Sequence, residues 1–192
     1  MKKLLLQQLT QEIQNCKKCS LWKTRNRPLV GEGSIISDVV FIGEAPGYRE
    51  DLTGQAFVGN AGNVLNRLLQ IANLKRDQIY ITNILKCHPP KNKNPLPSEI
   101  NACMDYLFRQ LKIIQPKVIF PLGKFATMTV FSKIGLYYTN ISNIHGKLFK
   151  IKASYGLVKI IPMYHPAAAC YNPSLIKILQ NDMQYFTKMC WK

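Results

Sequence analysis

Two short apolar segments of the chain each end at or just before a glycine, and this pattern constrains the fold more than any other feature. Residues 38–43 read Asp-Val-Val-Phe-Ile-Gly, and residues 117–121 read Lys-Val-Ile-Phe-Pro, with Gly123 two positions later. A continuous apolar run of this length, with no polar alternation, is typical of a strand buried on both faces of a parallel sheet. The glycines mark the points where the chain leaves the sheet.

Segments with helical spacing alternate with these strands, which predicts an α/β fold. The expected helices cover residues 3–14, about 63–71, 98–114, 123–132 and 173–189, and further strands are expected at 78–83, 147–152 and 157–162. We therefore predict a three-layer α/β/α fold with a mainly parallel central sheet, built as a single domain over residues 1–192. Ligands bind beyond the carboxyl ends of such strands. These ends are residues 43–57, 83–88, 123 onward and 165–172.

The charge of the 192-residue chain is strongly basic. Twenty-six Lys and Arg residues face ten Asp and Glu residues, a formal net charge of +16. Such a balance indicates a polyanionic partner, most often nucleic acid. No apolar run reaches the roughly 18 residues of a membrane span, and Gln7 and Gln8 interrupt the apolar start before a signal sequence forms. We expect a cytoplasmic protein without a membrane partner.

The acidic residues are not spread evenly. Residues 31–60 hold five of the ten carboxylates, whereas residues 106–181 hold ten Lys or Arg residues and no acid. Carboxylates near a phosphate-binding surface weaken binding unless they take part in chemistry. The cluster therefore indicates either a reactive site or a solvated acidic loop.

Four of the six cysteines form a pattern that suits a metal centre. Cys16 and Cys19 lie on one turn, Cys87 follows a predicted strand, and Cys103 lies in the next helix. A zinc ribbon more often has two short knuckles, and four irregularly spaced cysteines suit an iron–sulfur cluster as well. The spacing alone leaves iron–sulfur, zinc and no metal equally open.

Four motifs, in order along the chain, carry a resemblance to a known family. They are Gly43-Glu44-Ala45-Pro46-Gly47 continuing to Gly62, the segment 80–87, the segment 121–123, and His165-Pro166-Ala167-Ala168-Ala169. This set resembles the family 4, iron–sulfur uracil-DNA glycosylases. The resemblance implies a monofunctional hydrolase of base excision repair that flips uracil out of DNA, breaks its N-glycosidic bond and leaves an abasic site. It also implies a monomer that acts on uracil-containing DNA and holds one [4Fe-4S] cluster on Cys16, Cys19, Cys87 and Cys103.

The resemblance also implies roles for the residues of these motifs. His165 would stabilise negative charge at uracil O2, Asn83 would read O4 and N3–H, and Phe57 would stack on the flipped base. The backbone of Glu44, Ala45 and Pro46 would line the pocket, and Glu50, together with Glu44, would position water or stabilise the cationic sugar. The simpler alternatives are a helix-capping histidine, a turn asparagine and a core phenylalanine. His88 and His145 lack such a context and are expected at the surface.

The sequence departs from the family pattern at a few positions. Ala56 stands where the family usually has proline before the aromatic residue, which would loosen that loop, and Tyr171 stands where an arginine often precedes Asn-Pro. An alternative from another functional class is a non-catalytic iron–sulfur DNA-binding accessory domain of a replication or repair complex. The complete set of Glu44, Glu50, Phe57, Asn83 and His165 favours the enzyme.

Overall fold

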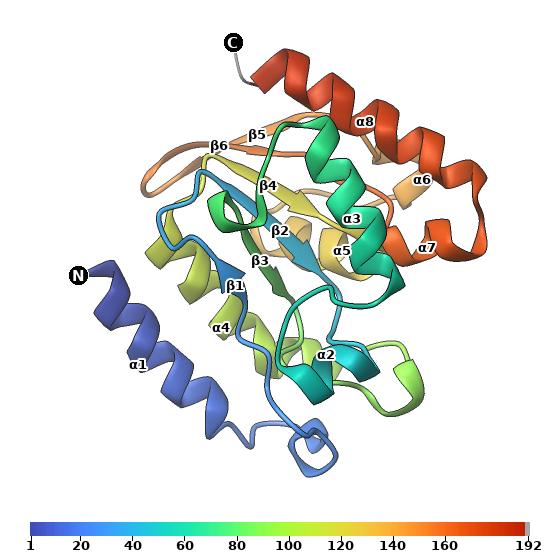
Figure 1. The fold of residues 1–192 in the computed structure, drawn as a ribbon. Helices are drawn as coiled ribbons and strands as arrows, with labels where there is room; N and C mark the ends of the chain where they lie inside the picture. The colour runs from blue at the N-terminus through green and yellow to red at the C-terminus, as the bar shows by residue number, and fades with distance from the viewer. Residues whose placement is uncertain (191–192) are drawn as a thin grey trace.

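The computed structural model describes residues 1–190, and within this range the strands form one six-stranded sheet (Figure 1). The strand order is β1-β3-β2-β4-β6-β5. The strands are β1 (Glu32–Gly33), β2 (Val39–Gly43), β3 (Tyr80–Asn83), β4 (Val118–Pro121), β5 (Phe149–Ala153) and β6 (Gly156–Ile160). The four central strands are parallel, and the edge strands β1 and β5 run antiparallel to their neighbours.

Helices cover both faces of the sheet (Figure 1). They are α1 (Lys2–Gln14), α2 (Tyr48–Thr53), α3 (Asn60–Ile71), α4 (Pro97–Ile114), α5 (Gly123–Lys133), α6 (Ile141–Ile144), α7 (Pro166–Tyr171) and α8 (Ser174–Cys190). Three short 3-10 helices, η1 (Ser20–Lys23), η2 (Arg76–Gln78) and η3 (Pro90–Asn92), complete the connections. None of the described helices combines the length and hydropathy that a membrane span requires.

Alternate side chains of β2, β3 and β4 point into two separate cores. Phe41 of β2 and Phe120 of β4 stack with ring centroids 4.7 Å apart and pack beneath α3 and α8. Val40 and Ile42 of β2 point the other way and pack against α4 and α5. Because both faces of these strands are buried, the strands read as unbroken apolar runs. The predicted three-layer fold with a mainly parallel sheet is confirmed.

The structure adds elements that the sequence pattern did not indicate. Strand β1 has only two residues, and α2 lies within residues 43–62, where the repeated glycines predict a loop. The His165-Pro166 pair likewise predicts a loop, but α7 begins at Pro166, because proline fits the first turn of a helix, in which no intrahelical N–H bond is lost. Residues 78 and 79, expected in a strand, end η2 and lead into β3 instead.

Candidate active site and cysteine pocket

The carboxyl ends of β2 and β3 lie side by side and form the base of a cleft. Gly43 and Asn83 are paired in the register of the two strands, and the ladder continues as Ile84 N–H donates to the Gly43 carbonyl at 3.0 Å. A Cβ atom on Gly43 would lie 2.3 Å from Asn83 Oδ1 and 2.9 Å from the Phe57 ring. Glycine at the end of β2 therefore lets a strand-end amide and an aromatic ring meet at one point.

The cleft above these strand ends has a volume of about 530 Å³. It contains every residue that the sequence analysis assigned to the substrate pocket, namely Glu44, Ala45, Pro46, Glu50, Phe57, Asn83 and His165. The remaining wall comes from Gly47, Ala61, Pro89, Asn92, Lys93, Asn94, Ala167 and Tyr171. Tyr171 is 91% exposed at the rim of this cleft. A cleft of this size at the carboxyl edge of a parallel sheet is typical of a small-molecule or base-binding site.

Asn83 carries an oxygen that no protein group satisfies. The residue is 2% exposed, and among the described residues its Oδ1 is the one buried side-chain nitrogen or oxygen without a hydrogen-bond partner. Buried polar atoms are nearly always paired, because the unpaired state costs about 1–3 kcal/mol. An unpaired acceptor at the base of a cleft indicates a place for a ligand donor.

Phe57 forms the apolar wall next to this amide. Its φ angle is +51°, an uncommon conformation for a bulky residue, and its ring lies 5.7 Å from the His165 ring with 24° between the planes. The backbone of Phe57 touches α3, where a Cβ atom on Gly62 would lie 1.7 Å from the Phe57 carbonyl oxygen. The ring is 7% exposed and belongs to the core on the α3 side of the sheet. Phe57 is thus both a core residue and a wall of the cleft.

His165 has one ring nitrogen occupied by the protein. Its Nδ1 accepts a hydrogen bond from Ala167 N–H at 3.1 Å, which caps the start of α7. A neutral imidazole that accepts at Nδ1 carries its proton at Nε2. Burial lowers the pKa of His165 to about 4, although the charge of Glu50 acts in the opposite direction. His165 is therefore a neutral N–H donor at neutral pH, and its capping role is part of what selects the donor nitrogen.

The two carboxylates of the cleft have different surroundings. Glu50 Oε1 accepts from Val58 N–H at 2.9 Å and from Gly59 N–H at 3.0 Å, where α3 begins. These two N–H groups fix the position of the Glu50 carboxylate, and its Oε2 lies next to Gly47. Burial raises the pKa of Glu44 above its ordinary value.

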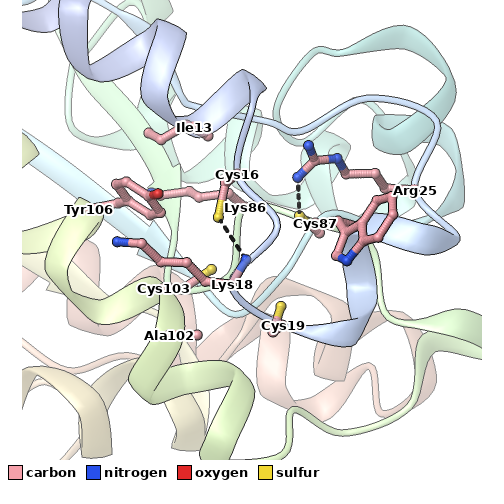
Figure 2. Close-up of a pocket in the computed structure, with 11 residues that line it drawn as sticks. Ile13, Cys16, Lys18, Cys19, Arg25, Lys86, Cys87, Ala102, Cys103 and Tyr106 are labelled. Carbon is pink, nitrogen blue, oxygen red and sulfur yellow. Dashed lines mark hydrogen bonds between the residues drawn. The ribbon is translucent and has the colours of Figure 1, made fainter.

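The four predicted ligand cysteines line a second, much smaller pocket (Figure 2). Cys16 follows α1, Cys19 precedes η1, Cys87 follows β3, and Cys103 lies in α4. Arg25 Nη1 donates to Cys87 Sγ at 3.1 Å, and Lys18 N–H donates to Cys16 Sγ at 3.5 Å. In the described part of the chain, no three Cys, His, Asp or Glu side chains lie close enough together to hold a single metal ion.

Two cysteines of this pocket, Cys87 and Cys103, are buried, and the other two are half-buried. Burial raises the pKa of Cys19 and of Cys87, and it raises the pKa of Cys103 to about 11. Lys86, also at the pocket, is 1% exposed and donates to Thr82, to the Asn83 carbonyl and to Gln110 at 2.6–2.8 Å. The pocket thus brings four cysteines together with Arg25, whose guanidinium donates to one of the sulfur atoms, and this set of groups suits an anionic metal–sulfur centre.

Two histidines expected at the surface make specific contacts instead. His88 Nδ1 lies 2.8 Å from the Pro46 carbonyl and is half-buried beside the cleft. His145 Nδ1 lies 2.8 Å from Asp182 Oδ2, and the histidine ring packs on Tyr164. Neither contact could be found from sequence spacing, because the partners are 42 and 37 residues away.

Known proteins resemble this chain over nearly its whole length. Residues 30–190 match the family model described as the uracil DNA glycosylase superfamily. A type-4 uracil-DNA glycosylase of Archaeoglobus fulgidus is 43% identical over 187 residues, covering 97% of this chain and 94% of that protein. A second one, from Sulfurisphaera tokodaii, is 44% identical over 180 residues, covering 93% of this chain and 82% of the relative. The chain therefore belongs to the type-4 uracil-DNA glycosylases of the uracil-DNA glycosylase superfamily.

Proposed function

We propose that this protein is a uracil-DNA glycosylase of base excision repair, which hydrolyses the bond between uracil and its deoxyribose and leaves an abasic site. The observation that carries the proposal is the unpartnered Oδ1 of Asn83, a residue that lines the same cleft as the neutral N–H donor His165. The family relationship supports the same activity.

Recognition rests on Asn83 and Phe57. A base inside a duplex is out of reach, so the target nucleotide must be flipped out of the stack before it enters the cleft. Asn83 Oδ1 then accepts the N3–H of uracil while the amide nitrogen donates to O4. Cytosine presents an acceptor at N3 and a donor at C4, so it would leave both groups of Asn83 unpaired. Stacking on Phe57 contributes about 1–3 kcal/mol for any base and supplies affinity without selectivity.

Bond breaking is helped by His165. As the C1′–N1 bond lengthens, negative charge develops on uracil and is concentrated partly at O2. A preorganised donor aimed at that oxygen stabilises the transition state more than the ground state. His165 supplies such a donor at Nε2, because Nδ1 is fixed by the Ala167 N–H. The imidazole remains neutral, since its pKa is about 4.

The sugar and the water are assigned to Glu50, with Glu44 as a further pocket residue. Two backbone N–H groups hold Glu50 Oε1, which leaves Oε2 as the acceptor for a water or as the negative charge facing a cationic sugar. Burial raises the pKa of Glu44 above its ordinary value, so its carboxylate binds a proton more readily than that of an exposed glutamate. Glu50 and Glu44 can share the two tasks.

The cysteine pocket would hold one [4Fe-4S] cluster on Cys16, Cys19, Cys87 and Cys103. The fit rests on four sulfur atoms around a common space and on Arg25, which donates to Cys87 Sγ (Figure 2). Iron binds the thiolate form of cysteine, so metal binding displaces the thiol protons. Because burial raises the pKa of Cys19, Cys87 and Cys103, these thiols stay protonated until the metal binds. Glycosidic hydrolysis moves no electrons, and we assign the cluster a structural role.

We assign DNA binding to lysines at and beside the cleft. Lys93 lines the cleft directly, and the loop that carries it, residues 89–95, also holds Lys91. Contacts of this kind neutralise phosphates and release counterions, so they bind DNA of any sequence. We expect a monomer as the active unit.

Incubation with a uracil-containing oligonucleotide followed by alkali tests the proposal. Alkali breaks the strand at an abasic site, so we expect cleavage at uracil and none in matched strands that carry cytosine or thymine at that position. An Asn83→Ala, His165→Ala double variant is the control for a contaminating glycosylase. A wild-type protein that holds iron and binds DNA but yields no breakage would instead support the non-catalytic accessory domain.

A further inference from the structure

An ion pair at the edge of the sheet, Glu32 and Arg76, forms hydrogen bonds with the peptide groups on both sides of Ala56. Ala56 N–H donates to Glu32 Oε2 at 2.8 Å, and the Ala56 carbonyl accepts from Arg76 Nη2 at 2.5 Å. Glu32 Oε1 also pairs with Arg76 Nη2, and Arg76 Nη1 donates to Asn66 in α3 at 3.0 Å. Ala56 itself is fully buried, although Glu32 and Arg76 are both about one-third exposed.

These hydrogen bonds hold Ala56, the residue directly before Phe57. The backbone of Phe57 is strained. A φ angle of +51° is disfavoured for a bulky aromatic residue and persists only where the surroundings over-determine it. The segment is restrained from three sides: by Glu32 and Arg76 before Phe57, by α3 at Gly62, and by Glu50 after it. Arg76 and Glu32 thus hold a conformation that the chain would otherwise leave.

The type of residue at position 56 explains why these hydrogen bonds are needed. A proline at this position would have no N–H and would limit its own φ angle. Alanine is freer and carries an N–H group that is buried and needs an acceptor. Glu32 Oε2 supplies that acceptor, so the ion pair restrains a peptide that alanine alone would leave free.

We propose that Glu32 and Arg76 are positioning residues that hold Phe57 ready for stacking on the flipped base. They touch no substrate and act only through the Ala56 peptide. The inference rests on the proposed function, because it assumes that Phe57 stacks on uracil.

A double-mutant cycle with Phe57 tests this. The measurement is single-turnover excision of uracil from a U·G duplex with saturating enzyme. Phe57→Ala should slow excision about 5- to 150-fold, the loss expected for a stacking contact. Glu32→Ala should slow excision about 5- to 30-fold in the protein with Phe57, and less than about twofold in the Phe57→Ala background, because a positioning residue has no effect without the group it positions.

Two further variants complete the design. Arg76→Lys keeps the charge but loses the planar guanidinium that binds Glu32, Ala56 and Asn66 together. It should slow excision as much as Glu32→Ala does, and it replaces that variant in the test if Glu32→Ala folds poorly. Asp38→Asn removes a carboxylate from the exposed Asp38–Lys117 ion pair and should excise uracil at the wild-type rate.

The outcomes separate the two ideas. Equal losses for Glu32→Ala in both backgrounds, or no loss in either, overturn the positioning role while leaving Phe57 in place. An unchanged rate for Phe57→Ala overturns the stacking assignment and the positioning role with it. A wild-type protein with no excision at all overturns the proposed function.

Discussion

The cleft and the cysteine pocket both use residues at or just beyond the end of β3. They differ in hydrogen bonding, because the cleft residue has an unpaired polar atom and the pocket residue has a paired one. Asn83 ends β3, lines a cavity of about 530 Å³ and keeps a buried acceptor unpaired, whereas Cys87, just beyond, lines a much smaller pocket and accepts a hydrogen bond from Arg25. An unpaired buried acceptor beside a cavity needs a donor that the protein does not supply, whereas a paired buried group supports the fold. The comparison indicates that chemistry belongs to the cleft and stability to the cysteines.

Removing one cysteine tests the structural role of the cysteine pocket, and we expect it to have the largest effect of the substitutions considered. Cys87→Ala leaves three thiols, too few to hold a cubane cluster, so we expect loss of iron from about four atoms per chain and a fall in unfolding free energy of about 4 kcal/mol or more. Metal analysis and thermal melting measure both. Cys170→Ala, at an exposed cysteine outside the pocket, is the matched control and should keep its iron. One zinc and no iron in the wild-type protein would contradict the cluster.

Removing His165 should break the chemical side while leaving the cysteine pocket intact. His165→Ala loses the donor to the departing uracil, so excision should slow by roughly 10²–10³-fold. Iron content and binding to abasic DNA should match those of the wild-type protein. Single-turnover kinetics with saturating enzyme makes the measurement, and His145→Ala, outside the cleft, is the control. A wild-type rate for His165→Ala would mean that another group stabilises the leaving base.

Removing Asn83 should sharpen the division within the cleft between recognition and catalysis. Asn83→Ala loses the groups that read N3–H and O4, so we expect a loss of about 10- to 100-fold in uracil excision and weaker discrimination against cytosine. The ratio of excision rates on uracil and cytosine strands is the readout. If His165→Ala lowered this ratio as much as Asn83→Ala did, the two residues would not have separate roles.

The pH dependence of stability is the smallest of these effects. Burial places the folded-state pKa of His165 at about 4, below its ordinary value of 6.5, so between these values the unfolded chain binds the proton more tightly. The free energy of unfolding therefore falls as the pH drops from 6.5 toward 4. Between pH 6.5 and 5 the wild-type protein should lose about 1.5 kcal/mol more than His165→Gln. Urea unfolding at the two pH values measures it, and parallel curves would show that His165 is not buried as a neutral group.

Local pattern was enough to predict most of the architecture. The unbroken apolar runs at 38–43 and 117–121 became β2 and β4, because strands buried on both faces need no polar residues. Elements with little periodicity escaped prediction. Strand β1 has two residues, and α7 has six, too few to show a pattern against the surrounding sequence.

The sequence by itself determined which chemical groups gather at the carboxyl edge of the sheet, because strand ends and the motifs that follow them are local features. The tertiary structure decided how those groups are held. Ala167 N–H selects the donor nitrogen of His165, and Glu32 reaches across 24 residues to the Ala56 peptide. Hydrogen-bond partners between distant segments depend on how helices and strands pack, so spacing along the chain carries no record of them.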